Sequence, residues 1–365
     1  MVPLSDVARV FFRLGVTAFG GPAVHLAMME EEIVRRRGWI THEELLDLMG
    51  AANLIPGPNS TEVAIHIGRK VAGTRGLLVA GLCFIVPAAL ITFALAWAYV
   101  RFGSFPRFRG VLRALEPIVV AVVLQAIFEL GKKALKNAAL WAIGIAATVA
   151  SALGVHELLV LLGAGVLAVG VGRKPAAAMV LGTGLVSSTA SAAPPTAVFL
   201  SFAKIGSVLF GGGYVLVAFL RSELVTRLHW LSEAQLLDAV AAGQITPGPL
   251  FTTATFVGYV VGGTSGAIAA TVGIFLPAFV FVAISAPLLP KLRASPLTSR
   301  LLDGVNVASL ALMAVVAVRL GRSVLIDPLT VALFVASAVA LVRFRVSSVW
   351  LVAAGTVVGV FVHGT

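Results

Sequence analysis

Two Pro-Gly-Pro triplets, at residues 56–58 and 247–249, interrupt apolar stretches and lie among side chains that donate hydrogen bonds. Proline suits the first turn of a helix, because the N–H that it lacks would be unpaired there. The start of a helix carries free N–H groups and partial positive charge, which together favour an anion. The alternative role of such polar side chains is helix capping and helix–helix hydrogen bonding. We predict an anion-binding site whose ligands surround the triplets: Asn53, Gly57, Asn59, Ser60, Thr61, Gln244, Gly248, Thr252 and Thr253.

Two further breaks precede the triplets, at Phe-Gly-Gly sequences that separate apolar stretches. The first contains Gly20 and Gly21 and is followed by Pro22, and the second contains Gly211 and Gly212. One break in a membrane helix is usually only a kink, but breaks at matching points of two repeats indicate a transporter binding site. These four glycines therefore join the predicted substrate ligands, and the breaks together provide four helix starts.

Helix starts alone are too weak to hold a dehydrated dianion. Each contributes roughly 0.3–2 kcal/mol, whereas removing water from an ion costs several kcal/mol. Arg13 and Lys204 stand at matching positions inside apolar stretches, six residues before each Phe-Gly-Gly. A basic side chain there is costly unless it faces a cavity or a partner. We predict that both bind the substrate; the alternative is that they extend to the membrane surface.

Two titratable side chains of the first half have no titratable counterpart in the second. Glu62 follows the first Pro-Gly-Pro and aligns with a threonine, and His25 aligns with Leu216. Ionisable groups inside a membrane mark proton relays, so we predict proton coupling through Glu62 and His25. The alternative for His25 is a histidine that only holds its neighbours in place. We expect no cofactor, no metal site and no enzyme activity, because the sequence has no converging acids, histidines or cysteines.

The composition places these breaks in a lipid bilayer. Of the 365 residues, 59% are hydrophobic and 12% are charged, against about 25% charged in a soluble domain. The mean hydropathy is +1.02. These values exclude an ordinary soluble enzyme, a disordered chain and a nucleic-acid binder, and the net charge of +11 comes from basic clusters between apolar stretches. Since the stretches do not alternate with polar residues, we predict an all-α polytopic membrane protein.

The chain is predicted to contain two homologous repeats. An offset of 191 aligns Phe19-Gly20-Gly21 with 210–212, Trp39 with Trp230, and the first Pro-Gly-Pro with the second. We place the repeats at 1–174 and 195–365, joined by a linker or linking transmembrane span at 175–194. The apolar stretches before residues 76 and 266 are too short to cross a bilayer, which needs about 20 residues. They are therefore predicted to be broken or re-entrant helices.

The charges of matching loops favour inverted repeats. The loop at 69–75 carries three basic residues and its counterpart at 259–265 carries none. Conversely, residues 155–157 include no Lys or Arg, whereas their counterpart includes Arg343 and Arg345. Because basic loops lie preferentially on the cytoplasmic side, matching loops of opposite charge are expected on opposite faces. The basic cluster from Arg101 to Arg113 does not follow this pattern.

The motifs resemble those of the chromate ion transporter (CHR) family in its two-domain, long-chain form. They are FGGPAVHLAMMEEEIVRRRGWIT and PGPNSTEVAIHIG in the first repeat, and FGGGYVLVAFLRSELV and GQITPGPLFTTATFVGYVVGG in the second. The resemblance covers nearly the whole chain. It implies a multi-pass protein of the prokaryotic plasma (inner) membrane that expels chromate, driven by the proton-motive force, and gives chromate resistance. Sulfate is a related tetrahedral dianion, and the resemblance implies that it competes with chromate.

Two alternatives stay open from the residues alone, a passive oxyanion channel and a transporter for a different anion. Uphill flux coupled to a pH gradient would separate a transporter from a channel. The expected partners are chromate or sulfate, protons and the lipid bilayer, without nucleic acid. A homodimer is compatible with the sequence.

Overall fold

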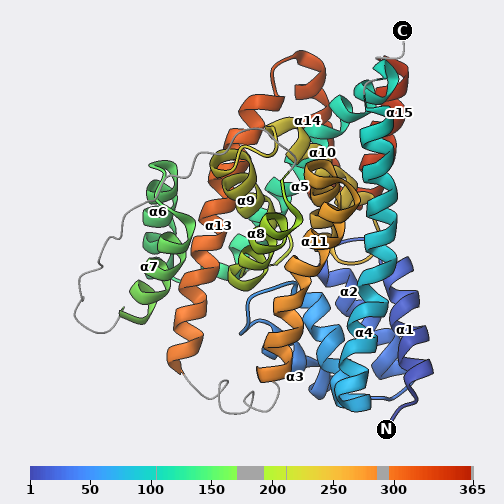
Figure 1. The fold of residues 1–365 in the computed structure, drawn as a ribbon. Helices are drawn as coiled ribbons and strands as arrows, with labels where there is room; N and C mark the ends of the chain where they lie inside the picture. The colour runs from blue at the N-terminus through green and yellow to red at the C-terminus, as the bar shows by residue number, and fades with distance from the viewer. Residues whose placement is uncertain (104, 171–192, 211, 286–295, 363–365) are drawn as a thin grey trace.

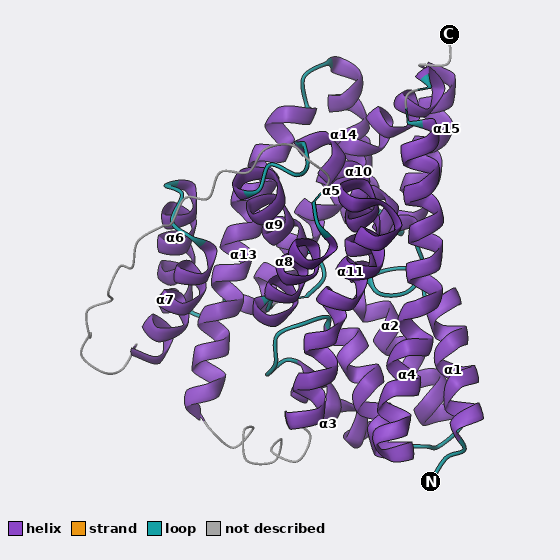
Figure 2. Ribbon diagram, in the orientation of Figure 1, coloured by secondary structure: helices purple, strands orange, loops and turns teal. Residues whose placement is uncertain are grey.

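The computed structural model describes residues 1–103, 105–170, 193–210, 212–285 and 296–362. Every regular element within those ranges is a helix, as Figure 2 shows. Four helices are long and apolar enough to cross a membrane: Asn59–Phe102, Arg109–Ala134, Leu250–Ser285 and Ser299–Val324. The chain is a multi-pass integral membrane protein, and the predicted all-α polytopic fold is confirmed.

Each element of the first repeat has a counterpart in the second. The first repeat contains α1 (Leu4–Thr17), α2 (Pro22–Met29), the π-helix η1 (Glu30–Arg36), α3 (His42–Ala52), α4 (Asn59–Phe102), α5 (Pro106–Ala134), α6 (Ala138–Ala152) and α7 (Glu157–Gly170). The second contains, in the same order, α8 (Pro195–Val208), α9 (Leu216–Leu220), the π-helix η2 (Arg221–Arg227), α10 (Glu233–Ile245), the short helix η3 (Leu250–Thr252), α11 (Thr253–Ser285), α13 (Pro296–Val324), α14 (Pro328–Arg343) and α15 (Ser348–Val362).

The correspondence between the repeats extends to irregular features. Both contain a π-helix of seven residues at the same place, and α5 and α13 are both 29 residues long. The two predicted repeats are therefore present in the fold. The boundaries 1–174 and 195–365 stay a prediction, and residues 175–192 of the predicted linker lie outside the described residues.

The helices α4 and α11 each contain a tight reversal of the chain, which separates a short first segment from a long second one. In α4 the backbone leaves the helical conformation at Ala72 and Gly73, and Gly73 has a φ of 66°. Gly68 and Gly76 then lie against each other, since a Cβ on Gly68 would be 2.3 Å from the Gly76 carbonyl oxygen. Such a close approach needs residues without side chains. α11 repeats the reversal at Gly263, with a φ of 62°, so the predicted short, re-entrant segments precede the long spans.

The two repeats run in opposite directions. In Figure 1, α4 rises from the side of the N-terminus to its upper end beside α15, whereas α11 descends toward the bottom of the view. The two helices pack against each other. This antiparallel arrangement agrees with the inverted repeats that the loop charges favour.

The last helices of each repeat pack on the other repeat. α6 and α7 lie against α13, while α14 and α15 lie against α5. Ion pairs join the same elements. Arg113 of α5 lies 3.0 Å from Asp327, the residue that caps α14, and Lys136, just before α6, lies 2.7 Å from Asp303 of α13. The repeats are therefore interlocked through both packing and charge.

Large apolar side chains remain exposed on the outer helices. They include Trp97 of α4, Trp141 and Ile145 of α6, Leu162 of α7 and Trp350 of α15. Soluble monomers rarely expose large continuous apolar patches. The hydrocarbon core of a bilayer accommodates such side chains, and there only unpaired polar groups are costly. This surface is therefore the one expected to face lipid.

Candidate functional site

The four helix breaks meet in pairs across the two repeats. The N–H of Gly57, in the first Pro-Gly-Pro, donates to the carbonyl oxygen of Leu209, beside the second Phe-Gly-Gly, at 2.8 Å. The N–H of Gly248, in the second triplet, donates to the carbonyl oxygen of Ala18, beside the first Phe-Gly-Gly, at 2.9 Å. The offset of 191 converts one bond into the other. All four breaks therefore lie where the repeats touch.

The backbone at the breaks requires glycine. Gly20, Gly57, Gly212 and Gly248 have φ values of 120°, 139°, 96° and 87°, which residues with a Cβ rarely adopt. Gly21 is extended instead and precedes α2 as its N-cap. The remaining predicted glycine ligand, Gly211, lies outside the described residues.

Glu62 is buried beneath the first Pro-Gly-Pro. The residue is 0% exposed, and neither carboxyl oxygen has a hydrogen-bond partner among the described residues. A Cβ added to Gly57 would lie 2.3 Å from Glu62 Oε1, so the carboxyl group packs against the glycine itself. The buried hydroxyl of Thr61 also lacks a partner among the described residues. Because buried polar groups without partners are costly, this break holds unused hydrogen-bonding capacity.

His25 connects the first Phe-Gly-Gly break to the start of α4. Its Nδ1 lies 3.1 Å from Ser60 Oγ, and its Nε2 lies 3.2 Å from the carbonyl oxygen of Ala18. That carbonyl oxygen is the one that accepts from Gly248 across the repeats. The contacts support the holding role considered for His25, and they also bring its ring to the site. Proton coupling through His25 stays a prediction.

The hydroxyl groups of the second Pro-Gly-Pro are used within their own turn. Thr252 Oγ1 donates to the carbonyl oxygen of Pro249 at 2.9 Å, and Thr253 Oγ1 donates to that of Leu250 at 2.8 Å. Both threonines thus serve the helix start, which is the alternative role named for them. Thr92 of α4 brings the other repeat to this break, with 3.2 Å between its Oγ1 and that of Thr252. Thr92 was not predicted, because a single threonine in an apolar stretch gives no signal.

The predicted amide ligands occupy different surroundings. Asn59 Nδ2 donates to Asn53 Oδ1 at 2.8 Å, and both residues line a cavity of about 490 Å³. Gln244, the counterpart of Asn53, is buried elsewhere with its Oε1 3.5 Å from Ser348 Oγ. Tyr214 is a second residue that sequence reasoning missed: a Cβ on Gly21 would lie 3.5 Å from its hydroxyl oxygen. Its position directly after the second glycine run was the available signal.

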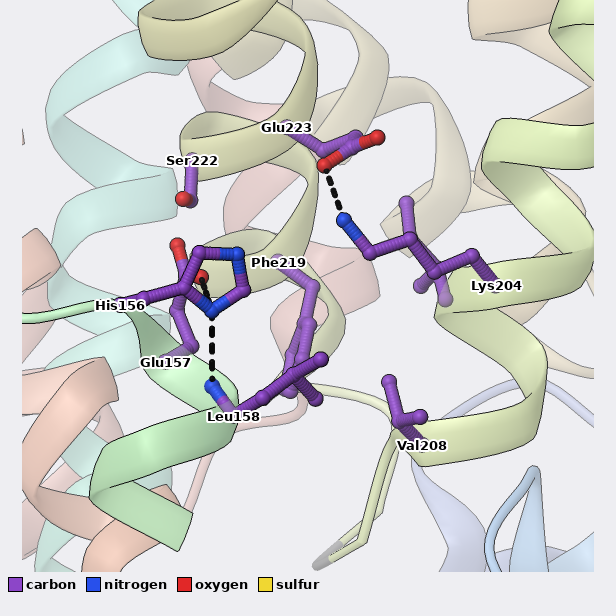
Figure 3. Close-up of a pocket in the computed structure, with 9 residues that line it drawn as sticks. His156, Glu157, Leu158, Lys204, Val208, Phe219, Ser222 and Glu223 are labelled. Carbon is purple, nitrogen blue, oxygen red and sulfur yellow. Dashed lines mark hydrogen bonds and ion pairs between the residues drawn. The ribbon is translucent and has the colours of Figure 1, made fainter. Parts of the chain in front are cut away.

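Arg13 and Lys204 each pair with a glutamate of the π-helix in the same repeat. Arg13 Nη1 lies 3.6 Å from Glu32 Oε1, and Lys204 Nζ lies 2.9 Å from Glu223 Oε2. Figure 3 shows the second pair beside a cavity of about 10 Å³, which also contacts His156. A space of that size holds about one water. Substrate binding by Arg13 and Lys204 therefore stays a prediction, with each cation already partnered.

The carboxylate of Glu223 is held in its charged form. Burial raises its pKa, but hydrogen bonds from Arg227 and Lys204 outweigh burial and hold the pKa below the ordinary value of 4.5. At neutral pH Glu223 is therefore ionised and offsets the charge of Lys204.

Comparison with known proteins shows to which family the chain belongs. The family described as chromate transporter matches the chain over residues 5–169 and again over residues 196–360. The chain belongs to the chromate transporter family. The double match follows the two repeats of the fold, and it confirms the resemblance carried by the motifs.

Three relatives whose names describe chromate transport are similar to most of the chain. The chromate transport protein of Cupriavidus metallidurans is 31% identical over 368 residues, covering 96% of this chain and 91% of that protein. The chromate transport protein of Pseudomonas aeruginosa is 32% identical over 333 residues, covering 86% and 80%. The probable chromate transport protein of Synechococcus elongatus is 30% identical over 338 residues, covering 89% and 86%. No solved structure matches with significance.

Proposed function

We propose that this chain moves chromate out of the cell across the plasma membrane, as a secondary transporter driven by the proton-motive force. The observation that carries the proposal is the pairing of four glycine-centred breaks across inverted repeats, through Gly57 with Leu209 and Gly248 with Ala18. Helix starts favour anions, and discontinuous helices at repeat interfaces are where transporters bind substrate. The names of the chromate transport relatives support chromate as the substrate.

The energetics favour export of a dianion. The membrane potential is worth about 2.3 kcal/mol per charge per 100 mV, so a dianion gains about twice that on leaving a cell that is negative inside. Protons that move inward supply further driving force when they are exchanged for chromate. Sulfate shares the tetrahedral shape and the charge, so we propose that it competes for the same site.

Glu62 is the proposed proton carrier. It is buried at the first Pro-Gly-Pro, without hydrogen-bond partners among the described residues, and in contact with Gly57. A carboxyl group in that position changes the charge of the break when it gains or loses a proton. His25 lies at the same break through Ser60 and Ala18 and is the second proposed participant.

Flux into proteoliposomes tests the proposal. The purified chain is reconstituted with the membrane potential clamped at zero, and a pH gradient is imposed in either direction. Exchange of protons for chromate predicts chromate accumulation when the lumen is acidic, and an uncoupler should abolish it. Accumulation only with an alkaline lumen would contradict export by exchange. Flux that only runs downhill would indicate a channel, and no flux of chromate or sulfate would indicate another anion.

A further inference from the structure

A cavity of about 490 Å³ opens beside the first Pro-Gly-Pro, between the end of α5 and α13. One water occupies roughly 30 Å³ in the liquid, so a tetrahedral oxyanion fits in this cavity together with water. Asn53 and Asn59 line the side of the cavity that belongs to the break, and Asn59 is the first residue of α4. A ligand in the cavity is therefore next to one of the four helix starts.

The cavity offers a cation without a counter-charge and a buried hydroxyl group. Lys133 lines it and forms no ion pair with any residue that the structure describes. The neighbouring Lys136 is neutralised by Asp303 at 2.7 Å. Ser309, from α13, also belongs to the lining; its hydroxyl oxygen is buried behind the cavity wall and has no hydrogen-bond partner within the described ranges. Ammonium, amide and hydroxyl groups are the donors that an oxyanion needs.

The second repeat does not reproduce this set of donors. In this part of the chain the two repeats are related by an offset of 190, as the bounds of α5 and α13 show. The offset relates the cavity residues to side chains of a different kind: Lys133 to Ser323, Ser299 to Arg109, Asp303 to Arg113, Asn306 to Glu116, and Ser309 to Val119. The ammonium group of Lys133 and the amide of Asn306 are not repeated, while two arginines and an acid stand at other positions, so this arrangement of donors belongs to one half of the pseudo-symmetric fold.

We propose that this cavity is the vestibule in which the oxyanion is first bound, from one face of the membrane, with Lys133 as its cation. The inference rests on the proposed function, since it takes the substrate to be an oxyanion. Lys133 attracts the dianion, Asn306 donates to its oxygens, and Asn59 leads to the helix start at the break.

Charge-selective labelling tests the vestibule without relying on transport. Cys83 is the chain's one cysteine, so Asn306→Cys in a Cys83→Ala background places a single thiol in the cavity lining. Its reaction rates with an anionic and a cationic methanethiosulfonate are each divided by their rates with a free thiol. We expect the anionic reagent to be favoured, and Lys133→Gln to lower the ratio by about tenfold, because one nearby unit charge acts on the two reagents in opposite senses. Sulfate, a dianion that does not oxidise thiols, should slow the labelling.

Lys132→Gln is the matched control, because Lys132 lies 4.1 Å over the ring of Phe128 and is not part of the cavity lining. It should leave the ratio unchanged and leave the chromate concentration for half-maximal flux unchanged, whereas Lys133→Gln should raise that concentration about tenfold. The vestibule proposal would be overturned if Lys133→Gln left the labelling ratio unchanged, or if the ratio fell equally in the Lys133→Gln and Lys132→Gln variants. If the selectivity holds but no chromate moves, the vestibule stands and the proposed substrate fails. If chromate moves without selectivity, the transporter stands and the vestibule fails.

Discussion

At the scale of single residues, the carboxyl group of Glu62 is the feature on which proton coupling depends. Glu62→Gln keeps the shape and removes the exchangeable proton. We expect the variant to pass chromate downhill and to lose accumulation driven by a pH gradient, measured as flux with and without the gradient. Because Glu62 has no hydrogen-bond partner among the described residues, the thermal midpoint should not fall. Full accumulation by the variant would contradict the coupling role.

Gly57 is constrained both by its own backbone conformation and by the side chain of Glu62, which packs against it. Gly57→Ala would place a Cβ 2.3 Å from Glu62 Oε1 at a φ of 139°. We expect loss of chromate flux and a destabilisation of roughly 1–3 kcal/mol, measured by thermal unfolding in detergent. Gly38→Ala is the control, because Gly38 also has a positive φ, of 60°, but nothing within 4 Å of an added Cβ. Equal flux in the two variants would show that the packing of Glu62 on Gly57 does not matter.

At the scale of elements, the ion pair of Lys204 with Glu223 connects α8 to η2. The pKa of Glu223 is below its ordinary value of 4.5, so the pair stabilises the fold above that pH and the contribution is lost as pH falls through the folded-state pKa. Glu223→Gln should therefore lower the thermal midpoint at pH 7. The difference from the wild type should shrink as the pH falls below about 4.5.

The double variant separates the structural role of Lys204 from substrate binding. If Lys204 only neutralises Glu223, then Lys204→Gln combined with Glu223→Gln should recover stability and flux relative to Glu223→Gln alone, in which Lys204 is left without its counter-charge. If Lys204 also binds chromate, as the sequence predicts, flux should stay low although stability recovers. The readouts are the thermal midpoint and the chromate concentration for half-maximal flux.

The sequence was most informative about elements that end at glycine and proline. The triplets at 56–58 and 247–249 and the glycine pairs predicted the breaks, because those residues change the backbone locally. The reversal at Gly73 could be expected only as an interruption between short apolar stretches, since its direction depends on the contact of Gly68 with Gly76. The pairing of the breaks was not predictable, because a hydrogen bond between backbone N–H and carbonyl groups of distant segments does not depend on the residue type.

At the scale of the whole molecule, the repeats exchange their last helices. α6 and α7 need α13, and α14 and α15 need α5, so neither repeat can bury its apolar helix faces alone. We expect fragments 1–174 and 195–365 to give stable, monodisperse protein when co-expressed, and to aggregate when expressed singly. A tag on one fragment should recover the other in detergent. Two fragments that each remain monomeric and folded would contradict the interlocked arrangement.

An ion pair between the repeats offers a control for that experiment. Arg113→Asp should weaken recovery of the partner fragment, because Arg113 and Asp327 lie 3.0 Å apart across the repeats. Asp327→Arg added to it should restore part of the recovery, since it restores the opposite charges but removes the cap of α14. Exposed pairs contribute only about 0–1 kcal/mol, so the effect should be partial. Complete loss would point to misfolding instead.

The crossed hydrogen bonds of the breaks also constrain how such a chain can evolve after a gene duplication. The segment at the Phe-Gly-Gly of one repeat is hydrogen-bonded to the Pro-Gly-Pro of the other, through Ala18 with Gly248 and Leu209 with Gly57. A substitution that shifts one break is therefore compensated in the opposite copy and not in its own. Correlated substitutions in descendants should link residues 18–21 with 246–249, and 209–213 with 56–58. The two copies can specialise in sequence, but they must do so as a matched pair.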